Sequence, residues 1–189
     1  LINSQASPLP VYGPADLACV TVAVHEGKQI ALLGHAFQVL ATPGHTFDHL
    51  AYYTPSCAWL FCGDTLFAGG CGRLFEGSPA QMLDSLEKLT ALPDDTLVFC
   101  AHEYTLANLE FALRAEPDNV LLQKRLEQVR AQRLQNLATI PSQIGLEKAT
   151  NPFLRCHLTS LSQGLQAAGK TSGTKVENFA ALRAWKNTA

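Results

Sequence analysis

Charged side chains are scarce in this sequence. Asp, Glu, Lys and Arg make up 16% of its 189 residues, whereas an average soluble domain contains about 25%. The formal net charge at pH 7 is only −2. So small a charge excludes a general electrostatic attraction to nucleic acid or to an anionic membrane. We therefore expect no nucleic-acid partner, and any anionic ligand must be bound locally by Arg or Lys.

Long hydrophobic runs are also missing. No apolar stretch approaches the roughly 20 residues that span a bilayer, and the first residues lack the basic, apolar and small-residue order of a signal peptide. The six cysteines include no C-x-x-C pair, which favours buried reduced thiols over disulfides. These features predict a cytoplasmic protein without a membrane partner.

Three short apolar runs each lead into a residue type that binds metals. Each run reads as a β-strand, and His45, Asp64 and His102 come shortly after the strand ends. A lone Asp at such a place is more often the cap of a turn, and a lone His is more often an ordinary core or surface residue. Divalent metals, however, are bound by imidazole nitrogen and carboxylate oxygen held on separate rigid elements. The coincidence of all three residues therefore favours a metal site.

Glycines follow Asp64 closely. Four of them lie in the stretch 69–77, and glycine allows the backbone to turn tightly and to approach a ligand. This composition predicts a loop that is folded around a bound molecule.

The first half of the chain has the pattern of an antiparallel sheet with one helix. Apolar, β-branched runs bounded by turn signals predict strands at 19–24, 30–33, 36–40, 50–53 and 58–62. Ser78, Pro79 and Gln81 then form a helix start with a capping box. An apolar stripe that includes Met82 and Leu86 should pack this helix on the sheet.

From about residue 106 the pattern changes to helices. Apolar residues at helical spacing define two of them, with Leu106, Leu109 and Leu113 in the first and Leu122, Leu126 and Val129 in the second. Asp118 is the expected N-cap of the second helix. The charges of that helix, among them Arg125 and Arg130, are expected to form a solvated surface. The pattern of residues 176–186 predicts a last helix.

Several of these stretches together resemble the metallo-β-lactamase superfamily. They are Thr-Pro-Gly-His45-Thr, Phe-Cys-Gly-Asp64-Thr-Leu-Phe and His102-Glu-Tyr-Thr. The run Gly-Gly-Cys-Gly-Arg-Leu-Phe-Glu-Gly77, the stretch Asn151-Pro-Phe-Leu-Arg155 and the closing Leu182-Arg-Ala-Trp-Lys186 narrow the resemblance to glyoxalase II, the hydroxyacylglutathione hydrolases. The resemblance implies an α+β fold. Residues 1–105 would form a metallo-β-lactamase-like αβ/βα sandwich with its N-terminal part missing, and residues 106–189 a C-terminal helical domain that binds the glutathione thioester.

Two departures accompany the resemblance. Asp48 stands where the family's His-Thr-x-Gly-His pattern has a glycine, and His45 is retained. The family's earlier His-x-His-x-Asp-His signature, which supplies further metal ligands, does not occur in the sequence. We therefore expect an N-terminally truncated chain that is inactive and poorly soluble by itself. If the chain proved active alone, His35 or His49 would be the candidates for completing the ligand set.

By the same resemblance, His45 binds a first metal ion, His102 binds a second, and Asp64 bridges the two. A carboxylate can bridge because it offers charge and lone pairs to two cations, which an imidazole nitrogen cannot. The implied cofactor is a pair of divalent ions, with zinc as the first expectation and iron or manganese as alternatives. Such a pair holds hydroxide at neutral pH by lowering the pKa of bound water towards about 7.

The resemblance also implies a substrate and a reaction. The expected activity is hydrolysis of S-(2-hydroxyacyl)glutathione thioesters, typically S-D-lactoylglutathione to D-lactate and glutathione, the second step of methylglyoxal detoxification. Arg73 and Tyr104 would lie beside the metals, and Arg183 and Lys186 would bind the glutathione carboxylates. Taken alone, Arg183 and Lys186 would be interpreted as a solvated last helical turn. We expect the complete protein to be a monomer.

Two alternatives stay open at this point. Another enzyme of the superfamily, such as a persulfide dioxygenase with one iron, would share the three strand-end ligands. It should lack the helical tail that carries Arg183 and Lys186. A non-catalytic remnant that binds glutathione conjugates or a partner chain would agree with the missing ligand signature.

Overall fold

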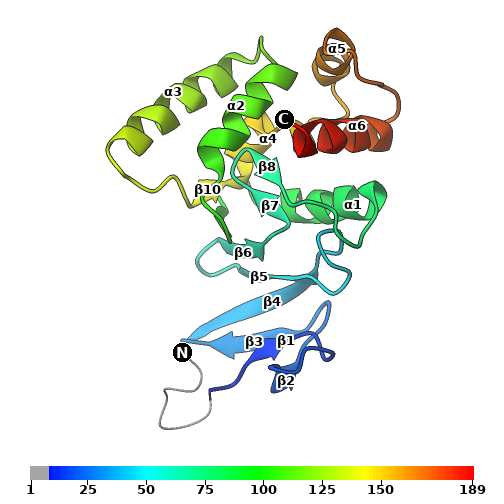
Figure 1. The fold of residues 1–189 in the computed structure, drawn as a ribbon. Coiled ribbons are helices and arrows are strands. Elements are labelled where there is room, and N and C mark those ends of the chain that lie inside the picture. Colours follow the sequence, from blue (N-terminus) through cyan, green and yellow to red (C-terminus); the bar gives the residue numbers. More distant parts are fainter. Residues whose placement is uncertain (1–8) are drawn as a thin grey trace.

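The computed structural model describes residues 9–189, whose path is drawn in Figure 1. The strands are β1 (Tyr12–Gly13), β2 (Val22–Ala23), β3 (Gln29–Leu32), β4 (His35–Ala41), β5 (Leu50–Thr54), β6 (Trp59–Gly63), β7 (Leu66–Phe67), β8 (Gly70–Cys71), β9 (Leu97–Cys100) and β10 (Ser142–Gln143). The helices are α1 (Pro79–Thr90), α2 (Thr105–Ala115), α3 (Val120–Leu134), α4 (Ile144–Thr150), the short 3-10 helix η2 (Pro152–Leu154), α5 (Thr159–Ala167) and α6 (Lys175–Asn187). Over residues 9–189, no helix has both the length and the apolar character needed to span a bilayer.

A six-stranded mixed sheet forms the centre of the molecule. Its strand order is β10-β9-β6-β5-β4-β3. The neighbours β6 and β9 are parallel, and every other neighbouring pair in this sheet is antiparallel. It follows that β4, β6 and β9 run in the same direction, so their carboxyl ends meet at one edge of the sheet. These are the strands that precede His45, Asp64 and His102.

The predicted strands at 30–33, 36–40, 50–53 and 58–62 are confirmed as β3, β4, β5 and β6. The prediction of a strand at 19–24 in the same ladder was wrong. Residues 14–20 form turns, and only β2 is extended, pairing in parallel with β1 in a separate two-stranded sheet. Both residues of β2 are exposed, so this segment lacks the buried face that would fix its register in the main sheet.

Helix α1 packs on one face of the sheet. The Ser78 hydroxyl accepts a hydrogen bond from the Gln81 amide, and the Gln81 side chain accepts one from the Ser78 amide. The predicted capping box is therefore confirmed. The apolar stripe of the helix is fully buried in one core with sheet residues such as Leu60.

The same core continues into the helical second half. Phe153 of η2 and Phe179 and Leu182 of α6 belong to one cluster of buried side chains with Leu60 of β6. Helices α2 and α3 pack together around a smaller cluster that includes Leu109. The predicted α+β class is confirmed, whereas the division into residues 1–105 and 106–189 stays a prediction.

Helix α3 is capped by Asn119, so the prediction of Asp118 was wrong. The Asn119 side-chain oxygen accepts a hydrogen bond from the Leu122 amide at 3.2 Å. Its amide nitrogen also donates to the Ala149 carbonyl at 3.1 Å. An aspartate cannot make this second bond because its carboxylate has no N–H to donate.

Arg125 of α3 is buried, which corrects its expected place on a solvated helix surface. It is 5% exposed, pairs with the fully buried Glu147 carboxylate, and donates to Ser142 Oγ at 2.9 Å and Thr150 Oγ1 at 2.6 Å. The expectation holds for Arg130, which is 55% exposed in its ion pair with Glu110. The sequence pattern alone does not separate these two arginines.

The second face of the sheet exposes aromatic side chains. Trp59 and Phe61 of β6 are 37% and 38% exposed, and the Phe61 ring stacks on Phe99 with centroids 5.0 Å apart. They line a hollow of about 540 Å³ with residues such as Leu32. Strand β6 thus carries apolar side chains on both faces, a pattern typical of strands whose sheet is covered on both sides. Among the described residues, the face with Leu60 is buried in the core, whereas the face with Trp59 and Phe61 is partly exposed.

Replacing Arg125 with Ala should lower the free energy of unfolding by about 3–5 kcal/mol, because it leaves the buried Glu147 carboxylate without its charge partner. The matched change Arg130→Ala breaks an exposed pair and should cost less than about 1 kcal/mol. Urea unfolding of both variants measures the difference. Equal losses would contradict a structural role for the buried pair.

Candidate active site

All seven residues singled out in the sequence line one pocket of about 590 Å³. They are His45, Asp64, Arg73, His102, Tyr104, Arg183 and Lys186. The pocket opens at the edge where β4, β6 and β9 end, and α6 supplies the last two residues. The structure therefore brings together the strand-end donors and the cations of the final helix, although at least 81 positions separate them in sequence (His102 to Arg183).

Asp64 is presented by a tight turn after β6. Gly63 has φ of +50°, and a Cβ at this position would lie 2.7 Å from His49 Nε2, so glycine is needed both for the backbone conformation and for the space. The Asp64 amide donates to His49 Nε2 at 3.1 Å. One oxygen of the Asp64 carboxylate, Oδ1, lies 3.2 Å from His102 Nε2. Asp64 and His102 thus form the closest pair of potential metal donors in the pocket.

His45 is oriented by the backbone of a neighbouring loop. Its Nδ1 lies 2.8 Å from the Arg73 carbonyl, which can only accept, so Nδ1 carries a proton. In the neutral ring Nε2 then keeps its lone pair, which is the arrangement commonly seen in metal-binding histidines. The ring also packs against Phe75, with centroids 4.8 Å apart.

His102 lies under Tyr104. Their rings stack at 4.9 Å with an interplanar angle of 18°, and the Phe67 ring meets Tyr104 edge-on at 5.6 Å. Tyr104 is 51% exposed, so its hydroxyl is accessible to a ligand in the pocket. The stack fixes the direction of the His102 ring through packing.

His49 and His35 do not complete the site. His49 Nδ1 is within hydrogen-bond distance of the hydroxyls of Thr42 (2.9 Å) and Thr65 (3.1 Å), and its Nε2 accepts from the Asp64 amide. Burial lowers its pKa, against an opposing effect of the Asp64 charge. His35 contacts Ser56 at 3.2 Å outside the pocket. The role of His49 is therefore to hold the backbone of Asp64, a function that the sequence did not indicate.

The two cations of α6 differ in their surroundings. Arg183 is 4% exposed; its Nη1 donates to the Cys71 carbonyl at 2.9 Å and its Nε to Asn187 Oδ1 at 3.0 Å. Lys186 Nζ lies 4.7 Å from the centroid of the Phe111 ring. Burial lowers the pKa of Lys186 to about 8, aided by the positive charge of Arg183. Lys186 is therefore the more available of the two for an anionic ligand.

The donor types in this pocket suit a divalent metal, but the described residues do not close a site. Imidazole nitrogen and carboxylate oxygen are ligands of zinc, iron and manganese. Over residues 9–189, no group of three or more His, Cys, Asp or Glu side chains is gathered closely enough to hold an ion. His45, Asp64 and His102 thus supply part of a ligand set.

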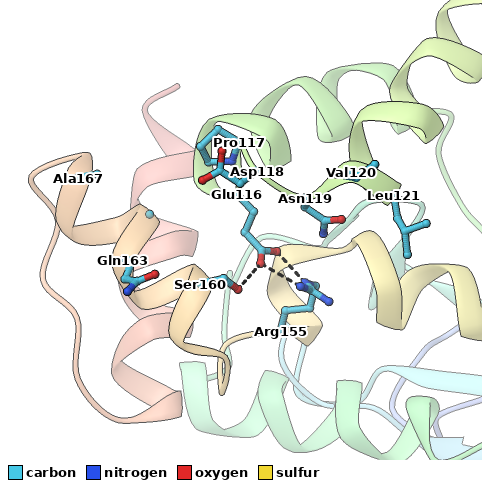
Figure 2. A pocket seen from close by; sticks show the side chains of 11 residues that line it. Glu116, Pro117, Asp118, Asn119, Val120, Leu121, Arg155, Ser160, Gln163 and Ala167 are labelled. Carbon is cyan, nitrogen blue, oxygen red and sulfur yellow. Dashed lines mark hydrogen bonds and ion pairs between the residues drawn. The ribbon is translucent and has the colours of Figure 1, made fainter.

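A second pocket, of about 450 Å³, lies where α2 leads into α3, and Figure 2 shows Glu116 in its wall bonded to Arg155 and Ser160. The Glu116 carboxylate accepts from Arg155 Nε at 2.8 Å, from Arg155 Nη2 at 3.1 Å and from Ser160 Oγ at 2.9 Å. Glu116 is 3% exposed. Since these groups satisfy each other, we interpret this second pocket as a structural contact between helices and the first pocket as the candidate active site.

Two family models together match residues 14–189. One, described as "Metallo-beta-lactamase superfamily", matches residues 14–102, and the other, "Hydroxyacylglutathione hydrolase C-terminus", matches residues 103–189. With the mixed sheet and its edge pocket, these matches define a protein of the metallo-β-lactamase superfamily. The hydroxyacylglutathione hydrolase of Thermosynechococcus vestitus (strain NIES-2133 / IAM M-273 / BP-1) is 52% identical over 186 residues, which are 96% of this chain and 72% of that protein. The chain belongs to the hydroxyacylglutathione hydrolase family.

Solved structures agree with this fold at lower identity. ETHE1 from Myxococcus xanthus matches with a TM-score of 0.59 and 27% identity over 94% of this chain, which corresponds to 58% of that chain. TTHA1623 in a di-iron-bound form matches with a TM-score of 0.50 and 28% identity, covering 77% of this chain and 65% of that one. The chain is thus shorter than the relatives it matches.

Lys186 should titrate with a pKa of about 8. After ¹³C-methylation of the lysines, its NMR signal, identified by its loss in Lys186→Arg, should shift around this pH. Arg114→Met removes one of the positive charges that lower this pKa and should therefore raise it. In the protein without either substitution, a Lys186 signal that titrates near the ordinary lysine pKa of 10.5 would contradict the half-buried position of Lys186.

Proposed function

We propose that this protein hydrolyses S-(2-hydroxyacyl)glutathione thioesters, with S-D-lactoylglutathione as the typical substrate and D-lactate and glutathione as products. This reaction is the second step of methylglyoxal detoxification. The observation that carries the proposal is the pocket that joins His45, Asp64 and His102 to Lys186 in a chain 52% identical to a hydroxyacylglutathione hydrolase. The six cysteines are free thiols, which agrees with a reducing, cytoplasmic location.

Cationic side chains support the choice of substrate. Glutathione carries two carboxylates, and Lys or Arg binds a carboxylate through charge-assisted hydrogen bonds. Lys186 and Arg73 line the pocket, and neither forms an ion pair with a carboxylate among the described residues. We propose that Lys186 binds one end of the glutathione moiety and that Arg73 lies nearer the thioester.

We propose that His45, Asp64 and His102 hold divalent metal, with zinc as the first expectation and iron or manganese as alternatives. A bound divalent ion supplies Lewis acidity and lowers the pKa of water, which makes a hydroxide nucleophile available at neutral pH. The protein contributes orientation: the Arg73 carbonyl fixes the His45 ring, His49 fixes the backbone of Asp64, and no side-chain nucleophile is required. The di-iron form of TTHA1623 supports iron as a real alternative.

A persulfide dioxygenase is the second candidate, because it would share the strand-end donors. The match of residues 103–189 to the hydroxyacylglutathione hydrolase C-terminus favours the hydrolase. In a version of this protein that also carries the family's His-x-His-x-Asp-His signature, used for this and the kinetic tests below, zinc, iron or manganese should support release of thiol from S-D-lactoylglutathione. The same protein should not consume oxygen with glutathione persulfide. Oxygen consumption without thiol release would reverse the assignment, and neither activity with any metal would reject both.

Asp64→Ala should lower kcat/KM for S-D-lactoylglutathione by about a hundredfold or more, since the variant loses the carboxylate nearest His102. Bound metal, measured by mass spectrometry of the dialysed protein, should fall with it. Asp84→Ala, at an exposed position of α1, is the matched control and should leave both unchanged. Full activity with full metal content in Asp64→Ala would remove this residue from the site.

Lys186→Met should raise KM for glutathione thioesters by about tenfold, while kcat changes less, because the lost contact binds substrate and transition state alike. Lys170→Met is the control: Lys170 also lies over an aromatic ring, 5.8 Å from the centroid of Trp185, but it does not line the pocket. Steady-state kinetics of the two variants give the comparison. An unchanged KM in Lys186→Met would limit Lys186 to a structural role.

A further inference from the structure

A buried turn forms part of the wall of the active-site pocket. It comprises β7, Ala68, Gly69 and β8, all of whose residues are buried, and it supplies Phe67 and Cys71 to the pocket lining. In Figure 1 it lies between the sheet and the helices of the second half. Asp64 precedes the turn by two residues, and the Gly72 amide closes it by donating to the Thr65 carbonyl at 3.1 Å.

The turn is packed against the backbone of Asp64 itself. A Cβ at Gly72 would lie 1.9 Å from the Asp64 carbonyl oxygen, a distance that no side chain can adopt. Gly69 has φ of +70°, and a Cβ there would lie 2.7 Å from a Leu109 methyl carbon. A displacement of the turn would therefore press on the Asp64 backbone through Gly72, the residue that follows β8.

The polar backbone groups of the turn are bonded to side chains from the helical half. The Gly69 amide donates to Glu147 Oε2 at 2.8 Å. Asn151 Nδ2 donates to the carbonyls of Phe67 and Gly70 at 3.3 and 2.9 Å. Because these groups are buried, each would be left unsatisfied if its partner were removed.

Glu147 lies at the centre of this set of bonds and is 0% exposed. Its Oε2 accepts from the Gly69 amide and from Asn151 Nδ2 at 3.0 Å. Its Oε1 is bound on the other side by Arg125 and Ser142. The carboxylate therefore joins α3 and β10 to the turn.

We infer that Glu147 is a positioning residue for the active site. It holds the turn beside Asp64 by accepting a hydrogen bond from the Gly69 amide, and Arg125 in turn holds the Glu147 carboxylate in place. A buried ion pair is weak evidence for stability by itself, because well-packed apolar residues often replace such a pair at little cost. Apolar residues cannot accept the Gly69 hydrogen bond. The catalytic part of this inference rests on the proposed hydrolase function, whereas its structural part does not.

The test uses the double variant Arg125→Met/Glu147→Leu, which removes both charges and the acceptor of the Gly69 amide. The matched control is Arg130→Met/Glu110→Leu, which removes an exposed pair of the same residue types. Two measurements report on the turn without any activity. They are hydrogen exchange of the Gly69 amide and alkylation of Cys71, a buried thiol whose pKa burial raises to about 11.

Both rates should rise about tenfold or more in the double variant, whereas exchange in α1 should stay within about twofold of the unmodified protein. The control should match the unmodified protein throughout. In steady-state kinetics kcat should fall about tenfold with little change in KM, the reverse of the pattern expected for a substrate-binding residue. If the double variant does not fold, the same measurements are made on Glu147→Asp. This variant keeps a carboxylate beside Arg125, but its side chain is shorter by one methylene and no longer reaches the Gly69 amide.

A folded variant with unchanged Gly69 exchange and Cys71 alkylation would overturn the inference. A loosened turn with unchanged kcat in an active thioesterase would overturn the positioning role. If the unmodified protein does not hydrolyse thioesters, the proposed function fails separately, and the exchange and alkylation rates still decide whether Glu147 holds the turn.

Discussion

The parallel pairing of β6 with β9 is the interaction on which the candidate site depends. It aligns Gly63 with Cys100, and the Ala101 amide donates to the Gly63 carbonyl at 3.0 Å, so the two strands leave the sheet side by side. Asp64 and His102 consequently emerge as neighbours. The antiparallel pairings through β5 give β4 the same direction, and its continuation brings His45 to the same edge. A shift of one residue in these pairings would turn the donors to the other face.

Much of the first half could be predicted from local pattern. The strands β3 to β6 follow apolar runs between turn signals, and α1 begins where Ser78 and Gln81 predict. These elements are specified by residues close together in sequence. β2 was predicted too long because β-branched residues favour extended backbone wherever they occur, while pairing in a sheet also requires a partner edge and a buried face.

The errors in the second half arise from long-range polar contacts. The side chain of Arg125 is determined by Glu147, which lies 22 residues away on another element, and the choice of Asn119 over Asp118 depends on the carbonyl of Ala149. Neither contact leaves a periodic signal in the sequence. His45, Asp64 and His102 were predicted from their places after three apolar runs, and the other four pocket residues came from the family resemblance. The roles of His49 and Glu147 were missed because both residues bind backbone amides, which leaves no motif in the sequence.

The side-chain contacts that hold the pocket wall also set the order in which this protein can reach its native state. The Gly69 amide bonds to a residue 78 positions later, and the Cys71 carbonyl to a residue 112 positions later. Contacts between such distant parts of a chain form slowly because much conformational entropy is lost before they are made. During synthesis the sheet and α1 leave the ribosome well before α6. The pocket is therefore completed only when α6 docks, whereas the bonds that Glu147 and Asn151 make to its glycine-rich turn can form before α6 has been synthesised.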